Sequence, residues 1–115
     1  MILQTLKVTM LYDFYGALLT ERQRRCLELH YLDDWSLAEV AEEFAVSRQA
    51  VHDILKRSVQ VMEDFESKLK LVENYEVQQQ LLQEISALVH KAKKESNAKS
   101  VTLDEIEEKV QELLS

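Results

Sequence analysis

The chain has 115 residues, of which 46% are hydrophobic and 30% charged, with no proline and a single glycine. This length is enough for one hydrophobic core. Because Gly and Pro, the residues that usually form β-hairpin turns, are scarce, we expect an all-α protein. A net charge of −7 excludes broad attraction to polyanions, because phosphate neutralisation supplies most of the affinity of non-specific nucleic-acid binding. Any such binding must come from a local patch of cations.

The chain has one cysteine, Cys26, which excludes an internal disulfide and fits a reducing compartment. We interpret this cysteine as a small core residue. The first eleven residues lack the features of a signal peptide, and no apolar run approaches the ~18 residues that span a bilayer. We therefore expect a cytoplasmic protein without a membrane partner.

The first predicted helix covers residues 2–18 and is expected to end near Gly16. It is expected to complete the core of the helices that follow. Its apolar stripe is Ile2, Leu3, Leu6, Met10, Phe14 and Leu18, widened by Val8, Leu11 and Tyr15.

A second helix is predicted to start at the capping box Thr20-Glu21-Arg22-Gln23 and to run to about Tyr31. It should bury Cys26, Leu27 and either Leu29 or Tyr31, and it carries a cluster of cations at Arg22, Arg24 and Arg25. Residues 32–35 should form a loop. Its two adjacent aspartates are interpreted as a solvated turn rather than as a catalytic pair.

Residues 36–56 have the pattern of a helix-turn-helix. The first helix has a capping box, with Ser36 as the cap and Glu39 three residues later, and a short connection follows at Ala45 and Val46. Ser47 can then cap the second helix.

The second helix of this motif should bury one face and expose the other. The residues expected inside are Ala50, Val51, Ile54 and Leu55, and those expected outside are Arg48, Gln49, His52, Asp53 and Lys56. Arg, Gln and His side chains can reach base edges or phosphates from a major groove, and Arg57 adds a further cation. Two alternatives remain open: an ordinary amphipathic helix pair, and a solvated His52 without a role.

The apolar pattern continues past the motif through Val72, with a break or bend expected near Asn74. A helix over 75–94, a polar linker over 91–100 and a last helix capped by Thr102 should follow. We therefore predict a helix-turn-helix domain over 1–72 and a C-terminal helical extension over 73–115. The long apolar faces favour a homodimer built partly from these helices, and the last helix could dock on its own chain or on a partner.

Signatures of catalysis and of metal binding are missing from the sequence. One glycine cannot build a phosphate loop, and neither a nucleophile elbow nor an HExxH motif occurs. The three histidines lie far apart, and Cys26 is not at metal-ligand spacing from any of them. We expect a protein that is not an enzyme and that needs no cofactor or metal.

Two families resemble this chain. The runs LTERQ at 19–23, LEL at 27–29, SLAEVA at 36–41 and SRQAV at 47–51 resemble region 4 of bacterial sigma factors, which reads promoter DNA. The runs LYDFYGALLT at 11–20, YLDD at 31–34 and VSRQAV at 46–51 resemble the YlxM family of small helix-turn-helix proteins from Gram-positive bacteria. YlxM proteins are typically encoded beside the GTPase of the signal recognition particle, so this resemblance implies a role in that targeting pathway.

These observations predict a regulator that binds nucleic acid through Ser47, Arg48, Gln49, His52, Lys56, Arg57, Arg22, Arg24 and Arg25. The nucleic acid could be DNA or the RNA of the signal recognition particle, with the particle's GTPase as a further candidate partner. Two alternatives to a role in the particle stay open. One is a sequence-specific DNA-binding transcriptional regulator, although Ala50, His52 and Asp53 depart from the sigma pattern, and the other is a protein-only adaptor.

Overall fold

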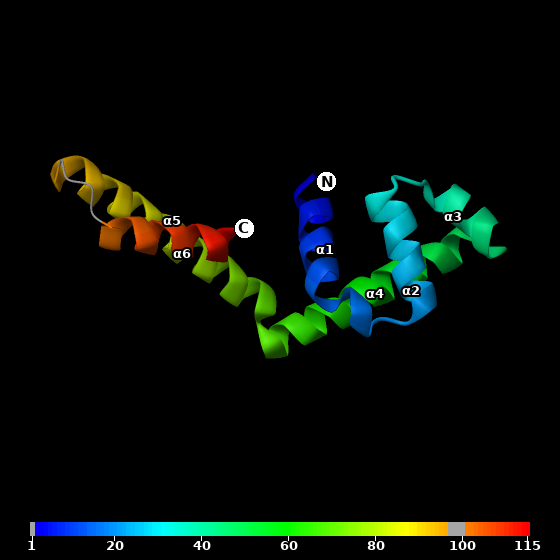
Figure 1. The fold of residues 1–115 in the computed structure, drawn as a ribbon. Coiled ribbons are helices and arrows are strands. Elements are labelled where there is room, and N and C mark those ends of the chain that lie inside the picture. The colour runs from blue at the N-terminus through cyan, green and yellow to red at the C-terminus, as the bar shows by residue number, and fades with distance from the viewer. Residues whose placement is uncertain (1, 97–100) are drawn as a thin grey trace. The chain divides into compact units, whose positions relative to one another are not determined.

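The computed structural model describes residues 2–96 and 101–115, which form helices and no strand (Figure 1). This confirms the all-α prediction. The chain divides into two compact units, residues 1–72 and 73–115, which are taken in turn below. In the described ranges no helix is long and apolar enough to cross a membrane.

The first helix, α1 (Ile2–Tyr15), is followed by a 3₁₀ turn, η1 (Gly16–Leu18), so the predicted end near Gly16 is confirmed. A Cβ atom at Gly16 would lie 2.9 Å from the ring of Tyr12, which explains why glycine is needed for this close approach. The predicted apolar stripe of α1 was centred on the wrong residues. Val8, Leu11 and Tyr15 form the core, whereas Leu6 and Leu18 are more than half exposed.

The second helix, α2 (Glu21–Leu27), begins at the predicted Thr20 capping box and continues into a wide π-helical turn, η2 (Glu28–Leu32). Cys26 and Leu27 are buried as predicted. We expected either Leu29 or Tyr31 to be buried with them, and both are partly buried against the core. The Glu28 carboxylate accepts a hydrogen bond from the Tyr12 hydroxyl, which ties η2 to α1.

The helix-turn-helix consists of α3 (Leu37–Phe44) and α4 (Arg48–Leu69), and the predicted caps at Ser36 and Ser47 are both present. Ala45 adopts a left-handed conformation with φ 54°, and α3 ends in a Schellman arrangement. In it, the Val46 N–H donates to the Ala41 carbonyl (3.0 Å) and the Ala45 N–H to that of Glu42 (3.2 Å). The last carbonyl groups of α3 are therefore satisfied while the chain turns sharply into α4.

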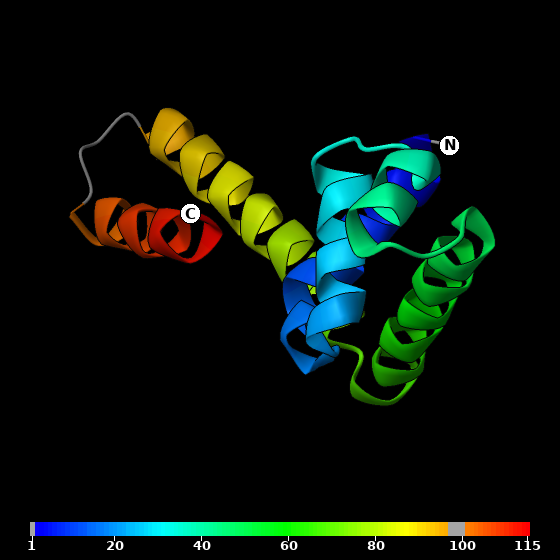
Figure 2. The ribbon, with the colours of Figure 1, turned by 90° about the vertical axis from the view of Figure 1, so that its right-hand side faces the viewer.

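The central element of the first unit is α4, because α1, α2 and α3 all pack against it (Figures 1 and 2). Its buried positions recur every three or four residues, at Val51, Leu55, Ser58 and Met62. Ser58 is buried without penalty, since its hydroxyl donates to the Ile54 carbonyl at 2.6 Å. The other face of α4 remains open to solvent.

The break after α4 lies at Lys70, four residues before the position predicted from Asn74. Lys70 is left-handed, with φ 54°, and α5 (Leu71–Ser96) starts immediately after it. The Tyr15 hydroxyl accepts from the Leu71 N–H (3.1 Å) and donates to Glu66, whose carboxylate accepts from the Val72 N–H (3.0 Å). Residues distant in sequence thus cap the start of α5.

The second unit contains the rest of α5 and α6 (Val101–Leu114), which form a helical hairpin with Val89 and Val110 buried. The predicted linker was wrong over 91–96, where α5 continues because its lysines and alanine are good helix formers. Its remaining residues, 97–100, lie outside the described part. Helix α6 begins at Val101, so Thr102 lies inside the first turn rather than at the cap.

The Tyr15 network leads to a prediction for stability. Tyr15→Phe removes the hydroxyl and leaves the Glu66 carboxylate and the Leu71 N–H each short of one partner at a partly buried site. We expect the free energy of unfolding to fall by about 1–3 kcal/mol, measured by urea denaturation. Tyr31→Phe is the control, since the Tyr31 hydroxyl has no hydrogen bond within the described residues, and it should change stability by less than about 0.5 kcal/mol. Equal losses in both variants would contradict the role of the network.

A second prediction concerns alkaline pH. Partial burial and the hydrogen bond to Glu28 raise the pKa of Tyr12 from 10.0 to about 12. The folded protein therefore holds this proton more tightly than the unfolded chain, so its contribution is complete below pH 10 and is lost as the pH rises toward 12. We expect the unfolding free energy to fall over this window, and Tyr12→Phe to reduce the slope by up to about 1.4 kcal/mol per pH unit. Identical slopes in urea titrations of the two proteins would refute the shift.

Candidate nucleic-acid interface

The start of α4 presents polar side chains on a rigid, capped helix. The Ser47 hydroxyl accepts a hydrogen bond from the Ala50 N–H at 3.0 Å. Ser47, a predicted binding residue, therefore serves as the N-cap of α4. The buried side chains of Val51 and Leu55 fix the rotation of the helix. The predicted outward residues are all exposed, namely Arg48, Gln49, His52, Asp53, Lys56 and Arg57.

An anion lies in the middle of this exposed face. The carboxylate of Asp53 accepts from Gln49 Nε2 at 3.0 Å, and His52 Nδ1 lies 3.7 Å from the same oxygen. The amide of Gln49 is therefore engaged along the helix instead of being directed outward. Both features weaken the reading of bases from a major groove, where a carboxylate can accept only from cytosine.

The arginines of α2 do not act as one cluster. The guanidinium groups of Arg22 and Arg25 each lie 5.9 Å from the ring centre of Phe44, on the side of α3. The side chain of Arg24 instead lies 4.0 Å from Glu28, which is bonded to Tyr12 of α1. Of these three arginines, Arg22 and Arg25 are therefore close to the helix-turn-helix, and the cluster predicted for α2 is divided.

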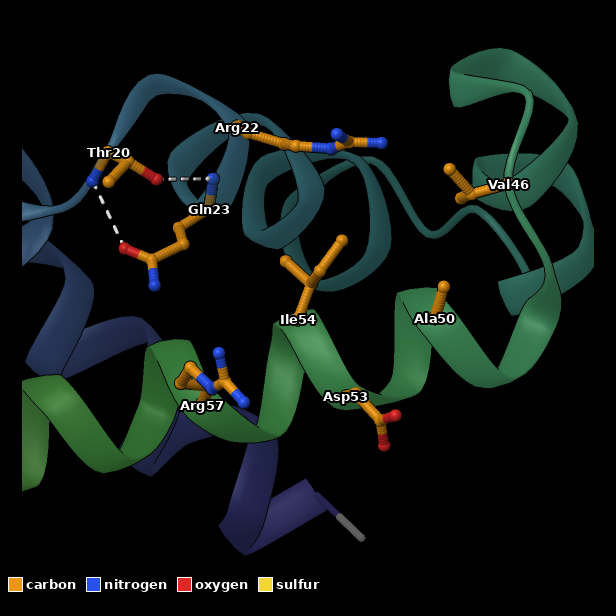
Figure 3. Close-up of a pocket in the computed structure, with 8 residues that line it drawn as sticks. All are labelled: Thr20, Arg22, Gln23, Val46, Ala50, Asp53, Ile54 and Arg57. Atoms are coloured by element: carbon orange, nitrogen blue, oxygen red, sulfur yellow. Dashed lines mark hydrogen bonds between the residues drawn. The ribbon is translucent and has the colours of Figure 1, made fainter.

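A groove of about 440 Å³ lies beside the contact between α2 and α4 and is lined by residues of both helices (Figure 3). Its apolar floor includes Val46, Ala50 and Ile54, and Arg22 and Arg57 lie at its borders from the two helices. A second hollow, of about 290 Å³, continues along α4. It is lined by Asp53, Lys56, Arg57 and Gln60. Arg22 and Arg57, distant in sequence, are thus brought to one surface.

Two residues of this surface were not predicted from the sequence. Phe44 was not among the predicted binding residues, and its ring lies against the guanidinium groups of Arg22 and Arg25. Gln60 extends the exposed face of α4 by one further turn. The helical period of α4 could have predicted that Gln60 is exposed on the same face as Lys56. The contact of Phe44 with the arginines of α2 depends on tertiary packing and could not be predicted from the sequence.

Cys26 lies in the core next to this region. Burial raises the pKa of the Cys26 thiol, although nearby Arg22 and Arg25 act in the opposite direction. Cys26 is fully buried, as expected of a core residue. Within the described ranges, no group of three or more His, Cys, Asp or Glu side chains could hold a metal ion.

Comparison with known proteins identifies the family. Residues 2–111 match the family described as "Putative helix-turn-helix protein, YlxM / p13 like", also called UPF0122. The chain belongs to the UPF0122 family. A UPF0122 protein of Halalkalibacterium halodurans is 49% identical over 88 residues, which cover 76% of this chain and 81% of the relative. A relative from Streptococcus gordonii is 51% identical, covering 72% and 76%, and one from Exiguobacterium sp. is 52% identical, covering 75% and 80%.

The position of Asp53 generates a prediction. Asp53→Asn removes the negative charge from the middle of the α4 face and keeps the size of the side chain. We expect affinity for nucleic acid at low salt to rise about fivefold, since one unit charge at 4 Å in water contributes ~1 kcal/mol. Fluorescence anisotropy titration would measure the change.

The chain offers a matched control at Asp64, which accepts from Gln60 Nε2 at 3.0 Å in the same i to i+4 arrangement. Asp64 lies about 16 Å further along the helix. Asp64→Asn should therefore have a smaller effect. Equal gains in the two variants would indicate a general charge effect and would contradict a binding surface centred on Asp53.

Proposed function

We propose that this protein is a non-enzymatic cytoplasmic regulator that binds nucleic acid through the exposed start of α4. The observation that carries the proposal is the surface formed by Lys56 and Arg57 on α4 with Arg22 across the groove. Exposed Arg48 adds a cation in the first turn of α4, the capped second helix of the helix-turn-helix. They provide a local site for phosphates on a chain whose net charge is −7.

The ligand that fits this surface best is a folded RNA, met through its shape and phosphates. The engaged Gln49 amide and the central Asp53 carboxylate disfavour the bidentate base contacts of DNA readers. Binding of RNA phosphates needs only cations at the correct spacing. The resemblance to YlxM proteins supports the RNA of the signal recognition particle as this ligand, with the particle's GTPase as a second partner, and hence a role in protein targeting.

Reading of promoter DNA is the second candidate function. The exposed first turn of α4, with Arg48 and Gln49 at its start, has the placement of a recognition helix. In this case Gln49 would have to leave Asp53 on binding. The similarity to sigma region 4 supports this candidate.

The test is a titration of the full chain with two ligands at two salt concentrations. One ligand is duplex DNA with promoters from the protein's own genome, and the other is the RNA of the signal recognition particle. Tighter, salt-dependent binding of the RNA is the expected result. Preference for one DNA sequence would make the protein a transcriptional regulator, and binding to neither would refute nucleic-acid recognition in favour of a protein-only adaptor.

Replacing Arg48, Lys56 and Arg57 by alanine should locate the site. We expect affinity to fall at least about tenfold and the slope of log K against log salt to decrease by roughly two to three, about one for each phosphate that is no longer neutralised. Alanine at Lys7, Lys68 and Lys109 is the control, since it removes the same charge from exposed positions elsewhere. Equal decreases in affinity for the two triple variants would place the site away from α4.

A further inference from the structure

The α5–α6 hairpin has a polar side. Gln111 Nε2 donates to the Ser86 hydroxyl oxygen at 3.2 Å, which links the two helices. Lys93 of α5 pairs with Asp104 and with Glu107 of α6, at 3.0 Å in the second case. Successive residues of a helix are rotated by about 100°, so these five residues lie on one side of the hairpin.

The opposite side of the hairpin is apolar and exposed. On α5, the exposed fractions are 54% for Val77, 53% for Leu81, 41% for Ile85 and 64% for Leu88. On α6, Ile106 is 39% exposed and Leu113 is 64% exposed. The same helical rotation, applied to two antiparallel helices, places these six residues together and away from the polar pairs.

The core of the hairpin is too small to stabilise it alone. Val89 and Val110 are its buried hydrophobic residues, with Leu82, Leu103 and Leu114 partly buried. The apolar surface of the six exposed side chains amounts to about three whole side chains, more than the hairpin buries fully. A helical segment of this size usually needs a further packed element for stability.

We propose that this apolar face binds a second copy of the same chain, with the two α5 helices antiparallel. The spacing of the stripe supports the pairing. Ala92, which is partly buried, continues the apolar positions of α5 by one turn. Leu81 and Leu88 are equally distant from the point between Glu84 and Ile85, and so are Val77 and Ala92. A twofold axis at this midpoint therefore packs Leu81 against the partner's Leu88 and the reverse.

The charges of α5 set the direction of the pairing. Residues 71–90 hold three acidic residues and no lysine or arginine, whereas residues 91–96 hold three lysines and one glutamate. Parallel helices would place lysines against lysines, while antiparallel helices place Lys91 and Lys94 near the partner's acidic half. The whole unit, with five lysines against nine acidic residues, disfavours an anionic membrane or a nucleic acid as the occupant.

Pairing has a consequence for the proposed site on α4. A dimer carries two such surfaces, so that one RNA or DNA molecule with two suitable segments would be held more tightly than by one copy. The pairing itself involves only α5 and α6. Its test therefore uses no nucleic acid, and its failure would leave the proposed function untouched.

The first experiment is sedimentation equilibrium of the full chain at micromolar concentration. The wild type should have twice the 13.5 kDa mass of one chain. The double variant Leu81→Glu, Leu88→Glu should have the mass of a single chain. Gln80→Glu with Gln83→Glu is the control, since it adds the same charge to exposed positions on the other side of α5 and should remain dimeric.

Cysteine substitution tests the antiparallel direction. Ile85→Cys places the thiol near the twofold axis and should form a disulfide-linked dimer under mild oxidation. Leu81→Cys alone should not, because the two thiols would be about 10 Å apart along the helices, whereas a mixture with Leu88→Cys should cross-link. The native Cys26 is fully buried and does not compete.

Three results would overturn the proposal. A wild type with the mass of one chain would show that the face is not a self-interface. A dimer that survives both glutamates would place the interface elsewhere. Self-cross-linking of Leu81→Cys as efficient as that of Ile85→Cys would contradict the antiparallel direction. Circular dichroism of each variant, expected to match the wild type, excludes unfolding as the cause of a lost dimer.

Discussion

The hydroxyl group of Tyr15, on α1, joins α4 and the first residues of α5. Its ring is fully buried and stacks on Phe65 of α4, with ring centres 6.0 Å apart, while its oxygen bonds to Glu66 and to the first N–H of α5. The free N–H groups at a helix start need acceptors, and here a side chain of α1 provides one. Because this acceptor lies at a fixed place in the core, it determines where α4 stops and α5 begins.

Helix α4 serves both as scaffold and as surface. One face is covered by α1, α2 and α3, so the other face is presented in a single fixed orientation. The Schellman turn at Ala45 and the Ser47 cap place the first turn of α4 at the edge of the motif. The aromatic ring of Phe44 adds Arg22 and Arg25 to this edge, which turns a common helix pair into a surface with cations from two elements.

The balance of charge explains why the proposed contact is limited and specific. The protein carries a net charge of −7, so that long-range attraction to a polyanion is absent and only the short cationic surface can bind one. Asp53 places a negative charge on that surface and accepts a hydrogen bond from Gln49. For the proposed function, such an arrangement suits a partner recognised by shape more than a DNA sequence read base by base.

The sequence by itself determined the features that depend on neighbouring residues: the all-α class, the caps at Thr20, Ser36 and Ser47, the corner at Ala45 and the exposed face of α4. Capping and helical periodicity act within one or two turns, so a single sequence is enough to predict them. Only the tertiary structure decided the stripe of α1, the break at Lys70, the separation of Arg24 from Arg22 and Arg25, and the two sides of the α5–α6 hairpin. Each of these depends on an interaction between residues far apart in the chain, such as Tyr15 with Leu71 or Arg22 with Phe44, and sequence spacing carries no information about which of several apolar or charged faces will be covered.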